Sequence, residues 1–264
     1  MPHPSVPFPS VFPFAPVKRV LFRIDFPQLF SMENLIGEFQ TKIMAQFPDS
    51  KILMEKAVIL GKIIESEGGI PTSYPESEPF KKIWQFKSED GGITVQIALD
   101  NLTIDSASHK TYNNEGAKKF RETIEFVVKH FLDITHIPII KRIGLRYIDE
   151  CPIPIDMEET SFSRYYHSSL PIQKFSLKES SELTCIAVCK RGEVTLRFQE
   201  HFEPSEIADQ PPKLILDFDG SQNRVIAERY LAITDAIHEV IGIEFRDAVT
   251  PVFETYMQTG AFEG

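Results

Sequence analysis

Four arginines stand in two stretches of similar sequence and are the residues best suited to bind another molecule. Residues 16–27 read PVKRVLFRIDFP, and residues 141–149 read KRIGLRYID. When the first stretch is displaced by 123 residues, Arg19 and Arg23 fall on Arg142 and Arg146. A guanidinium suits planar, bidentate recognition of a carboxylate or a phosphate. We therefore predict a binding site for an anionic ligand or a partner protein at these four arginines.

Internal pairing is the alternative for these arginines. Apolar and polar residues alternate in both stretches, which predicts strands whose arginines all point away from the core. If the two strands are neighbours, the four side chains meet on one sheet face. The same alternation places three carboxylates on that face, and these could neutralise the arginines. They are Asp105, Asp217 and Asp219.

The other residues that could take part in catalysis or metal binding form no recognisable motif. The seven histidines are scattered, and the sequence contains no H-E-x-x-H, P-loop, G-x-S-x-G or G-x-G-x-x-G motif. His130 and His238 fall late in two predicted helices, where imidazoles commonly interact with terminal carbonyls. Three cysteines without C-x-x-C spacing do not indicate zinc. We expect no catalytic residue, no metal site and no cofactor.

The first half of the chain predicts the order β-α-β-β-β-β-α. A strand at 18–26 precedes a helix at about 31–47, for which Ser31 is a suitable N-cap. Next come a β-rich run at 51–66, a Gly- and Pro-containing loop at 68–79 and a hairpin at 81–99 that turns at Asp90-Gly91-Gly92. A strand at 101–107 and a helix at about 114–133 complete this half, with Ala117 and Phe120 on the apolar stripe of the helix.

The second half predicts a similar order. A strand leads to a short helix within 157–170, a strand at 174–180, a hairpin at 183–199 turning at Arg191-Gly192, and a strand at 213–219. The final helix is expected at about 222–241, with a stripe that includes Ile226, Tyr230, Ile233 and Ile237. Residues 200–212 form an acidic, proline-bearing insertion, and the tail from residue 243 has no clear pattern.

These orders predict an α+β protein of two pseudo-repeated β-α-β4-α halves. The halves would share one antiparallel sheet with the long helices on one face, as in TATA-binding-protein-like or helix-grip-like folds. Two ferredoxin-like units fit less well, because each half has four consecutive strands. The expected division is a proline-rich extended arm at 1–15, a first half at 16–137 and a second half at 138–264, packed as one unit.

Short motifs give the sequence a family resemblance. They are Trp84-x-Phe86 with Asp90-Gly91, then Tyr112, then R-I-G-L-R-Y-I-D at 142–149, and finally Asp217 to Asp219 with His238. In these the chain resembles a family of uncharacterised, sporadically distributed prokaryotic proteins, sometimes encoded near CRISPR-associated genes. Asp149 stands where that family most often has Asn. The resemblance implies a prokaryotic origin and a defence-linked context, and it implies no activity.

Composition narrows the classes of partner. The chain has 264 residues and a formal charge of −10, so non-specific nucleic-acid binding is disfavoured by long-range repulsion. No apolar run approaches the roughly 18 residues of a membrane span. Few cysteines and no signal peptide indicate the cytoplasm.

We therefore expect a non-enzymatic binding protein that uses its open sheet face, or the cleft beneath it, to bind a partner or an anionic ligand. Two alternatives remain. One is a nucleotide- or nucleic-acid-processing enzyme in a prokaryotic defence pathway. The other is a structural subunit of a larger complex, docked by its proline-rich arm. The sequence sets neither the ligand nor the oligomeric state.

Overall fold

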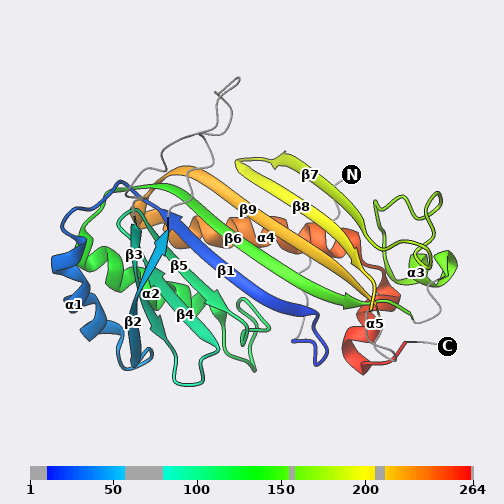
Figure 1. The fold of residues 1–264 in the computed structure, drawn as a ribbon, viewed down its shortest axis with the longest axis horizontal. Coiled ribbons are helices and arrows are strands. Elements are labelled where there is room, and N and C mark those ends of the chain that lie inside the picture. Colours follow the sequence, from blue (N-terminus) through cyan, green and yellow to red (C-terminus); the bar gives the residue numbers. More distant parts are fainter. Residues whose placement is uncertain (1–10, 57–79, 155–157, 206–211, 263–264) are drawn as a thin grey trace, which may run out of the picture.

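A nine-stranded antiparallel sheet forms the body of the protein, in the order β2-β3-β4-β5-β1-β6-β9-β8-β7 (Figure 1). The computed structural model describes residues 11–56, 80–154, 158–205 and 212–262. In the first part of the chain the elements are β1 (Val17–Asp25), α1 (Met32–Ile43), β2 (Asp49–Lys56), β3 (Phe80–Lys87), β4 (Ile93–Ile97), β5 (Asn101–Ser106) and α2 (Phe120–Thr135).

The second part supplies four strands and three α-helices. They are β6 (Ile139–Pro152), α3 (Glu159–Tyr165), β7 (Leu183–Arg191), β8 (Val194–Glu203), β9 (Lys213–Ile226), α4 (Tyr230–Ala248) and α5 (Pro251–Thr259). A 3₁₀ turn, Ala227–Arg229, joins β9 to α4. The prediction of an α+β protein with one large antiparallel sheet is confirmed.

β1 and β6 lie side by side at the centre of the sheet, as the two similar stretches predict. They pair antiparallel, and Phe22 lies opposite Leu145. These are also the two residues that the displacement of 123 positions relates. A twofold axis that exchanged the two strands would therefore pass beside this pair.

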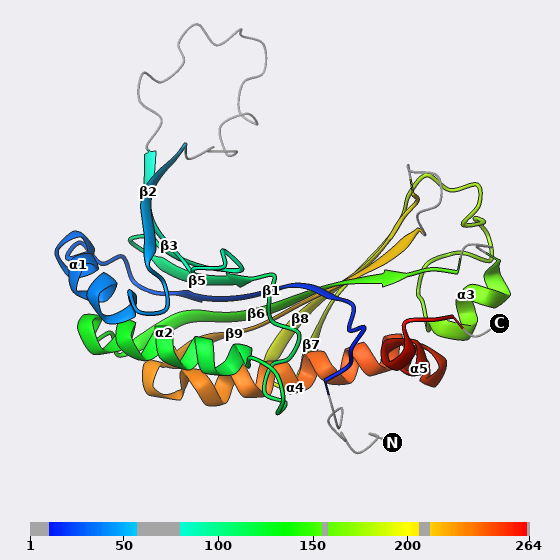
Figure 2. The same ribbon diagram turned by 90° about the horizontal axis from the view of Figure 1, so that it is seen from below.

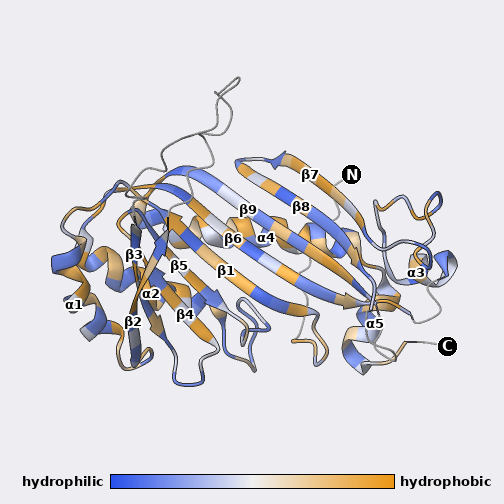
Figure 3. Cartoon of the chain, in the orientation of Figure 1, coloured by the Kyte–Doolittle hydropathy of each residue, from blue (hydrophilic) through white to orange (hydrophobic). Residues whose placement is uncertain are grey.

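Helices cover one face of the sheet and leave the other open. Figure 2 shows α2 and α4 beneath the strands and α1 next to α2 at one end of the sheet, with both ends of the sheet bending away from α2 and α4. The alternation of apolar and polar residues along β1, β6 and β9 is visible in Figure 3. Apolar side chains on the helix side, among them Phe22, Leu145 and Phe218, are completely buried. We call the uncovered side the open face.

Two glycine-containing turns match their predictions. Gly91 and Gly192 both have positive φ, of 67° and 61°, and each lies in the turn of a hairpin, between β3 and β4 and between β7 and β8. Asp90 fixes the first turn because its Oδ1 accepts a hydrogen bond from the Gly92 amide at 2.9 Å. Glycine is favoured at such positions because it has no Cβ to clash in the left-handed region.

One predicted strand is wrong. Residues 174–180 form turns and bends, so three strands follow α3 where four were expected. Apolar alternation in this segment depends on Phe175 and Leu177, and these do not share a buried face, because Phe175 is exposed while Leu177 is buried. A backbone hydrogen bond from Phe175 to the Pro171 carbonyl starts a turn instead.

The final helix lies further along the chain than predicted. β9 continues to Ile226, which is 58% exposed at the end of the strand and does not belong to the buried helix stripe. The sequence signal fails here because Ile226 has helical spacing to Tyr230. Tyr230, Ile233 and Ile237 are buried as expected. α4 reaches Ala248, so it takes up the start of the unassigned tail, and α5 follows.

The other helices begin or end close to their predicted limits. α1 stops at Ile43, and Ser31 occupies its N-cap without a side-chain capping bond. α2 begins at Phe120, so Ala117 is exposed in the preceding loop. The predicted loop at 68–79, most of the run at 51–66, residues 1–10 of the arm and the middle of the acidic insertion lie outside the described residues.

Candidate functional site

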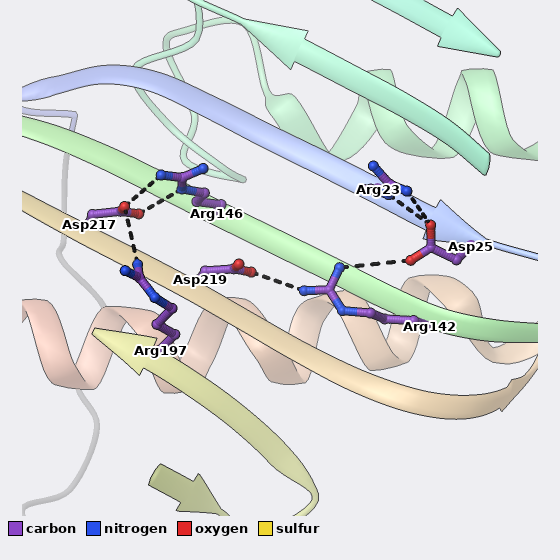
Figure 4. Close-up of polar contacts among 7 residues, drawn as sticks. All are labelled: Arg23, Asp25, Arg142, Arg146, Arg197, Asp217 and Asp219. Carbon is purple, nitrogen blue, oxygen red and sulfur yellow. Dashed lines mark hydrogen bonds and ion pairs between the residues drawn. The ribbon is translucent and has the colours of Figure 1, made fainter. Parts of the chain in front are cut away.

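The four predicted arginines do lie on the open face, and each contacts a carboxylate. Figure 4 shows three of them, Arg23, Arg142 and Arg146. Arg146 donates from Nε and Nη2 to the two Asp217 oxygens, at 2.7 and 2.6 Å. Arg142 Nη2 donates to Asp219 at 3.3 Å. We give the name arginine–aspartate ladder to these four arginines and their four aspartate partners: Arg19, Arg23, Arg142, Arg146, Asp25, Asp105, Asp217 and Asp219.

The first strand contributes the other half of the ladder. Arg19 donates from Nε to Asp105 on β5 at 2.6 Å, and a second bond joins its Nη2 to the same carboxylate. Arg23 pairs with Asp25 of its own strand at 2.7 Å. Asp25 also lies 4.0 Å from Arg142, so it joins the two central strands. These carboxylate contacts raise the pKa of Arg19 and Arg146.

Burial differs along the ladder. The Asp217 side chain is 8% exposed and also has Arg197 of β8 at 3.8 Å. The partners of Arg19 and Arg23 are about a quarter exposed. The ladder holds four arginines and four aspartates, so the internal pairing anticipated as the alternative is what the geometry favours. Anion binding by Arg19, Arg23, Arg142 and Arg146 stays a prediction.

A cavity of about 610 Å³ lies on the other side of the sheet. Its wall combines the helix face of β6, the start of β1, the loop after β5, α4 and residues 11–17. Val11, Phe12, Ala15, Pro16 and Met257 supply part of its apolar lining. Its size and mixed lining match those of sites for small organic ligands, which are commonly 300–1,000 Å³.

The loop between β5 and α2 is folded back to place Tyr112 in the cavity wall. The amides of Phe120 and Arg121 donate to the carbonyls of Thr111 and Tyr112, at 3.2 and 3.0 Å. These bonds satisfy amides at the helix start that have no partner within the helix. Gly116, with φ of 87°, allows the reversal.

An ion pair between helices holds this wall in place. Arg121 of α2 donates to both oxygens of Asp235 on α4, at 2.8 and 3.0 Å. The Tyr112 hydroxyl donates to Asp235 at 2.6 Å. Burial and the Asp235 carboxylate raise the Tyr112 pKa. The positive charge of Arg121 is thus already used within the protein.

His238 lies between two tyrosines in the cavity wall. Its ring stacks on that of Tyr112 at a centroid distance of 4.1 Å and lies 5.9 Å from that of Tyr147. Burial lowers the His238 pKa to about 4, so the ring is neutral at neutral pH. The position differs from the prediction: α4 extends ten residues beyond His238, which is therefore in mid-helix and not at its carboxyl end.

Asp149 is the carboxylate of β6 that faces the cavity. It is 3% exposed, and no hydrogen bond or ion pair to it is formed among the described residues. Burial raises its pKa to about 7, although the positive charge of Lys110 acts in the opposite direction. The nearby Tyr147 hydroxyl is buried without a hydrogen-bond partner in the described part of the chain. Buried polar groups without partners are rare in folded proteins.

Metal ligation is not indicated where the structure is described. No group of three or more His, Cys, Asp or Glu side chains is placed to hold a metal ion within residues 11–56, 80–154, 158–205 and 212–262. Asp217 and Asp219 pair with arginines, as argued above. Over the same ranges, no helix combines the length and apolarity that crossing a bilayer requires.

Four residues from the motifs behind the family resemblance line the cavity. Tyr112, Tyr147, Asp149 and His238 come from three separate stretches of sequence and all line it. No family model matches the chain, and no curated protein matches it. The resemblance therefore stays a prediction, and the cavity has to be interpreted from its own chemistry.

The four arginines lie on the sheet face that the sequence predicts. A cleft beneath the sheet was expected as an alternative binding site, but the residues that line the cavity were not predicted. One signal was present: in the strand of residues 141–149, Tyr147 and Asp149 fall on the apolar side. A carboxylate on the core side of a central strand costs free energy unless it has a partner or a proton. An acidic residue at such a position is therefore a sequence-level indication of a polar site.

Proposed function

We propose that this protein is a non-enzymatic binding protein that takes a small organic molecule into the cavity between β6 and α4. The observation that carries this proposal is the combination of a cavity of about 610 Å³ with a buried carboxylate, Asp149, that has no partner among the described residues. A largely apolar cavity with a few polar groups gives a ligand both affinity and orientation.

Filling the cavity from α4 tests the proposal. Gly242 lines it, and a Cβ built on Gly242 has no other atom within 4 Å. A side chain at residue 242 would therefore begin in open space, and we expect Gly242→Leu to occupy part of the cavity. Fluorescence of the neutral dye N-phenyl-1-naphthylamine should rise on mixing with the wild type. In Gly242→Leu we expect the apparent dye affinity to fall at least about tenfold, because the leucine side chain takes up space that the dye would fill.

Matched controls separate cavity filling from helix stabilisation. Gly37 of α1 also has open space at its Cβ and does not line the cavity. Glycine costs a helix interior about 1 kcal/mol relative to alanine, so Gly242→Ala and Gly37→Ala should both raise stability. Gly37→Leu should keep wild-type dye binding. Equal dye binding by wild type and Gly242→Leu, or none by either, would contradict the proposal.

The open face is a second candidate, favoured by one observation: none of the described helices covers it, and the sheet curves around it (Figure 2). A protein segment or an anionic ligand would bind there through Arg19, Arg23, Arg142 and Arg146. Poly-glutamate is a suitable probe. If the arginines bind it, Arg23→Ala should lose retention of the probe and keep its melting temperature. Unaltered retention in both Arg23→Ala and Arg146→Ala would remove this candidate.

The enzyme alternative would use the same cavity. A carboxyl with a pKa of about 7, as in Asp149, is suited to general acid–base catalysis at neutral pH. Binding without turnover is the simpler reading, because the Asp149 carboxylate makes no hydrogen bond or ion pair among the described residues that would orient it.

A duplication would account for the architecture, and we include it in the proposal. Support comes from the central register, in which Phe22 and Leu145 are both paired and equivalent in the repeat. Three free cysteines, of which Cys151 is buried, are compatible with a cytoplasmic setting. A link to defence genes depends on the family resemblance alone.

A further inference from the structure

The charged side chains around the cavity differ in whether they have a bonded partner. Arg121 pairs with Asp235 and also lies 3.5 Å from Glu125. The Lys110 ammonium donates to the Val17 carbonyl. Asp235 accepts from both Arg121 and Tyr112. Glu239 and Arg246 also line the cavity, and both have partners. Asp149 is thus the charged lining residue that has no bonded counterpart among the described residues.

Secondary structure holds Asp149 in this position. It belongs to the centre of the sheet, where β6 pairs with β1 on one side and with β9 on the other. The register between β1 and β6 shifts at this point, so that Val17 lies opposite Asp149. The extra residue at this shift is Lys18 of β1, and Asp149 keeps the regular alternation of β6, on the same side of the sheet as Tyr147. The side chain therefore lies on the helix side of the sheet, and with 3% of the residue exposed it is largely removed from bulk water.

A lone buried carboxylate attracts a cation more strongly than any other ligand group. Removing it from water costs several kcal/mol, and a bonded positive charge offsets this cost. Aromatic rings nearby add to the attraction, because a cation is stabilised over the face of a tyrosine or phenylalanine. Tyr112, Tyr147, Phe12 and Phe245 provide such rings in the cavity wall. His238 is neutral and adds no repulsion.

We infer that the cavity binds an organic amine: a protonated amino group that pairs with Asp149, carried on an apolar body that contacts the aromatic lining. This inference rests on the proposed function, since it names the class of ligand for the same cavity. An anionic ligand is disfavoured there, because it would meet an uncompensated carboxylate. The volume of about 610 Å³ admits an amine with a two-ring body.

Two probes that differ in charge test the ligand class. Dansylcadaverine carries a primary amine on an apolar fluorophore, and its N-acetyl derivative has the same fluorophore and linker without the charge. Wild-type protein should bind the amine at least about tenfold more tightly than the acetylated probe, as expected for a hydrogen bond to a charged group. Titrations followed by dansyl fluorescence measure both affinities.

Asp149→Asn should remove this preference. Asparagine preserves the shape of the side chain and lacks the charge, so both probes should bind this variant with similar affinity. Lys110→Gln removes the nearest competing cation and should bind the amine at least as tightly as the wild type. A preference that persists in Asp149→Asn, or amine binding that is lost in Lys110→Gln, would overturn the inference.

The outcomes also separate this inference from the proposed function. If both probes bind equally to the wild type and Gly242→Leu excludes them, the amine class is wrong and small-molecule binding stands. If neither probe binds, and the neutral dye does not bind either, both proposals fail. Circular dichroism of each variant confirms that the fold is retained.

Discussion

The ion pairs of the ladder differ in how deeply their carboxylates are buried. Arg146 pairs with the nearly buried Asp217, whereas Arg23 pairs with a more exposed neighbour in its own strand. Removing Arg146 would leave a buried carboxylate with Arg197 at 3.8 Å as its remaining contact among the described residues. We expect Arg146→Ala to lower the free energy of unfolding by about 1–3 kcal/mol. Urea denaturation measures this loss.

Arg23→Ala is the matched control for that measurement. An exposed ion pair contributes about 0–1 kcal/mol, so this variant should unfold near the wild-type midpoint. Equal losses in the two variants would show that burial of Asp217 does not set the strength of the pair. The contrast also bears on binding, because an arginine that stabilises the fold strongly is less available to a ligand.

Asp149 gives stability a specific pH dependence. Its pKa is raised from the ordinary value of 3.8 to about 7, so the folded protein binds a proton that the unfolded chain releases. Stability from this group is therefore complete below about pH 4 and is lost as the pH rises through about 7. Asp149→Asn should equal the wild type near pH 4 and exceed it by about 2–4 kcal/mol at pH 8.

Neighbouring groups set the background for this experiment. Lys110 lowers the Asp149 pKa and Asp217 raises it. His109 and His238 have pKa values lowered to about 4, so their contributions are lost as the pH falls from about 6.5 to 4, in the opposite sense. Comparing the variant with the wild type at each pH cancels the histidines. A constant difference between pH 4 and pH 8 would contradict the raised pKa.

At the scale of elements, the approach of α4 to the sheet depends on Gly220 in β9. A Cβ at this position would lie 2.5 Å from Cγ2 of the fully buried Ile237. Overpacking a filled core typically costs 1–3 kcal/mol, so Gly220→Ala should destabilise the protein by about that amount. Thermal unfolding followed by circular dichroism measures the effect.

Gly144 offers a comparison in the adjacent strand, β6. A Cβ there would meet the guanidinium of Arg142 at 2.7 Å, which is the end of a flexible side chain on the open face. We expect Gly144→Ala to cost clearly less than Gly220→Ala, because Arg142 can move and α4 cannot. A larger loss in Gly144→Ala would mean that the ladder is as rigid as the core.

Most helices and strands were predictable because the spacing of their apolar residues fits only one type of secondary structure. The strict alternation around Phe22 fits a strand buried on one side, and Phe120 and Ile124 fit a helix stripe. The prediction failed where the position of one apolar residue fitted both the spacing of a strand and the spacing of a helix. The spacing of Ile226 to the apolar residues after it fits a helix, but its backbone continues the preceding strand. In the folded protein it is the last residue of β9. Residues 174–180 had alternation but no neighbouring strand to pair with.

The candidate sites were predictable to different extents for a related reason. All residues of the ladder project from strands, so alternation alone assigns them to one face. The cavity is built from the arm, two strands, a loop and three helices, which no local pattern relates. Asp149 could be assigned to the core side from the sequence, but the space beside it depends on how α4 and residues 11–17 pack.

At the scale of the molecule, the two faces of the sheet have separate roles. The ladder on the open face balances four arginines with four aspartates, so the formal charge of −10 must come from other parts of the chain. The helix side contains the core and the cavity. A ligand bound in that cavity would contact both central strands, because β1 and β6 each contribute to its wall.

The central position of β1 has a consequence for synthesis on the ribosome. β1 precedes the other described strands of the sheet in the chain, and its neighbour β6 begins at Ile139, after all of β2 to α2. Until β6 arrives, one side of β1 is an uncovered edge, which is the kind of surface that recruits strands from other chains. Charged side chains on such an edge discourage that pairing. We therefore expect Arg19 and Arg23 to discourage such pairing in the nascent chain, before they form the ion pairs of the finished sheet.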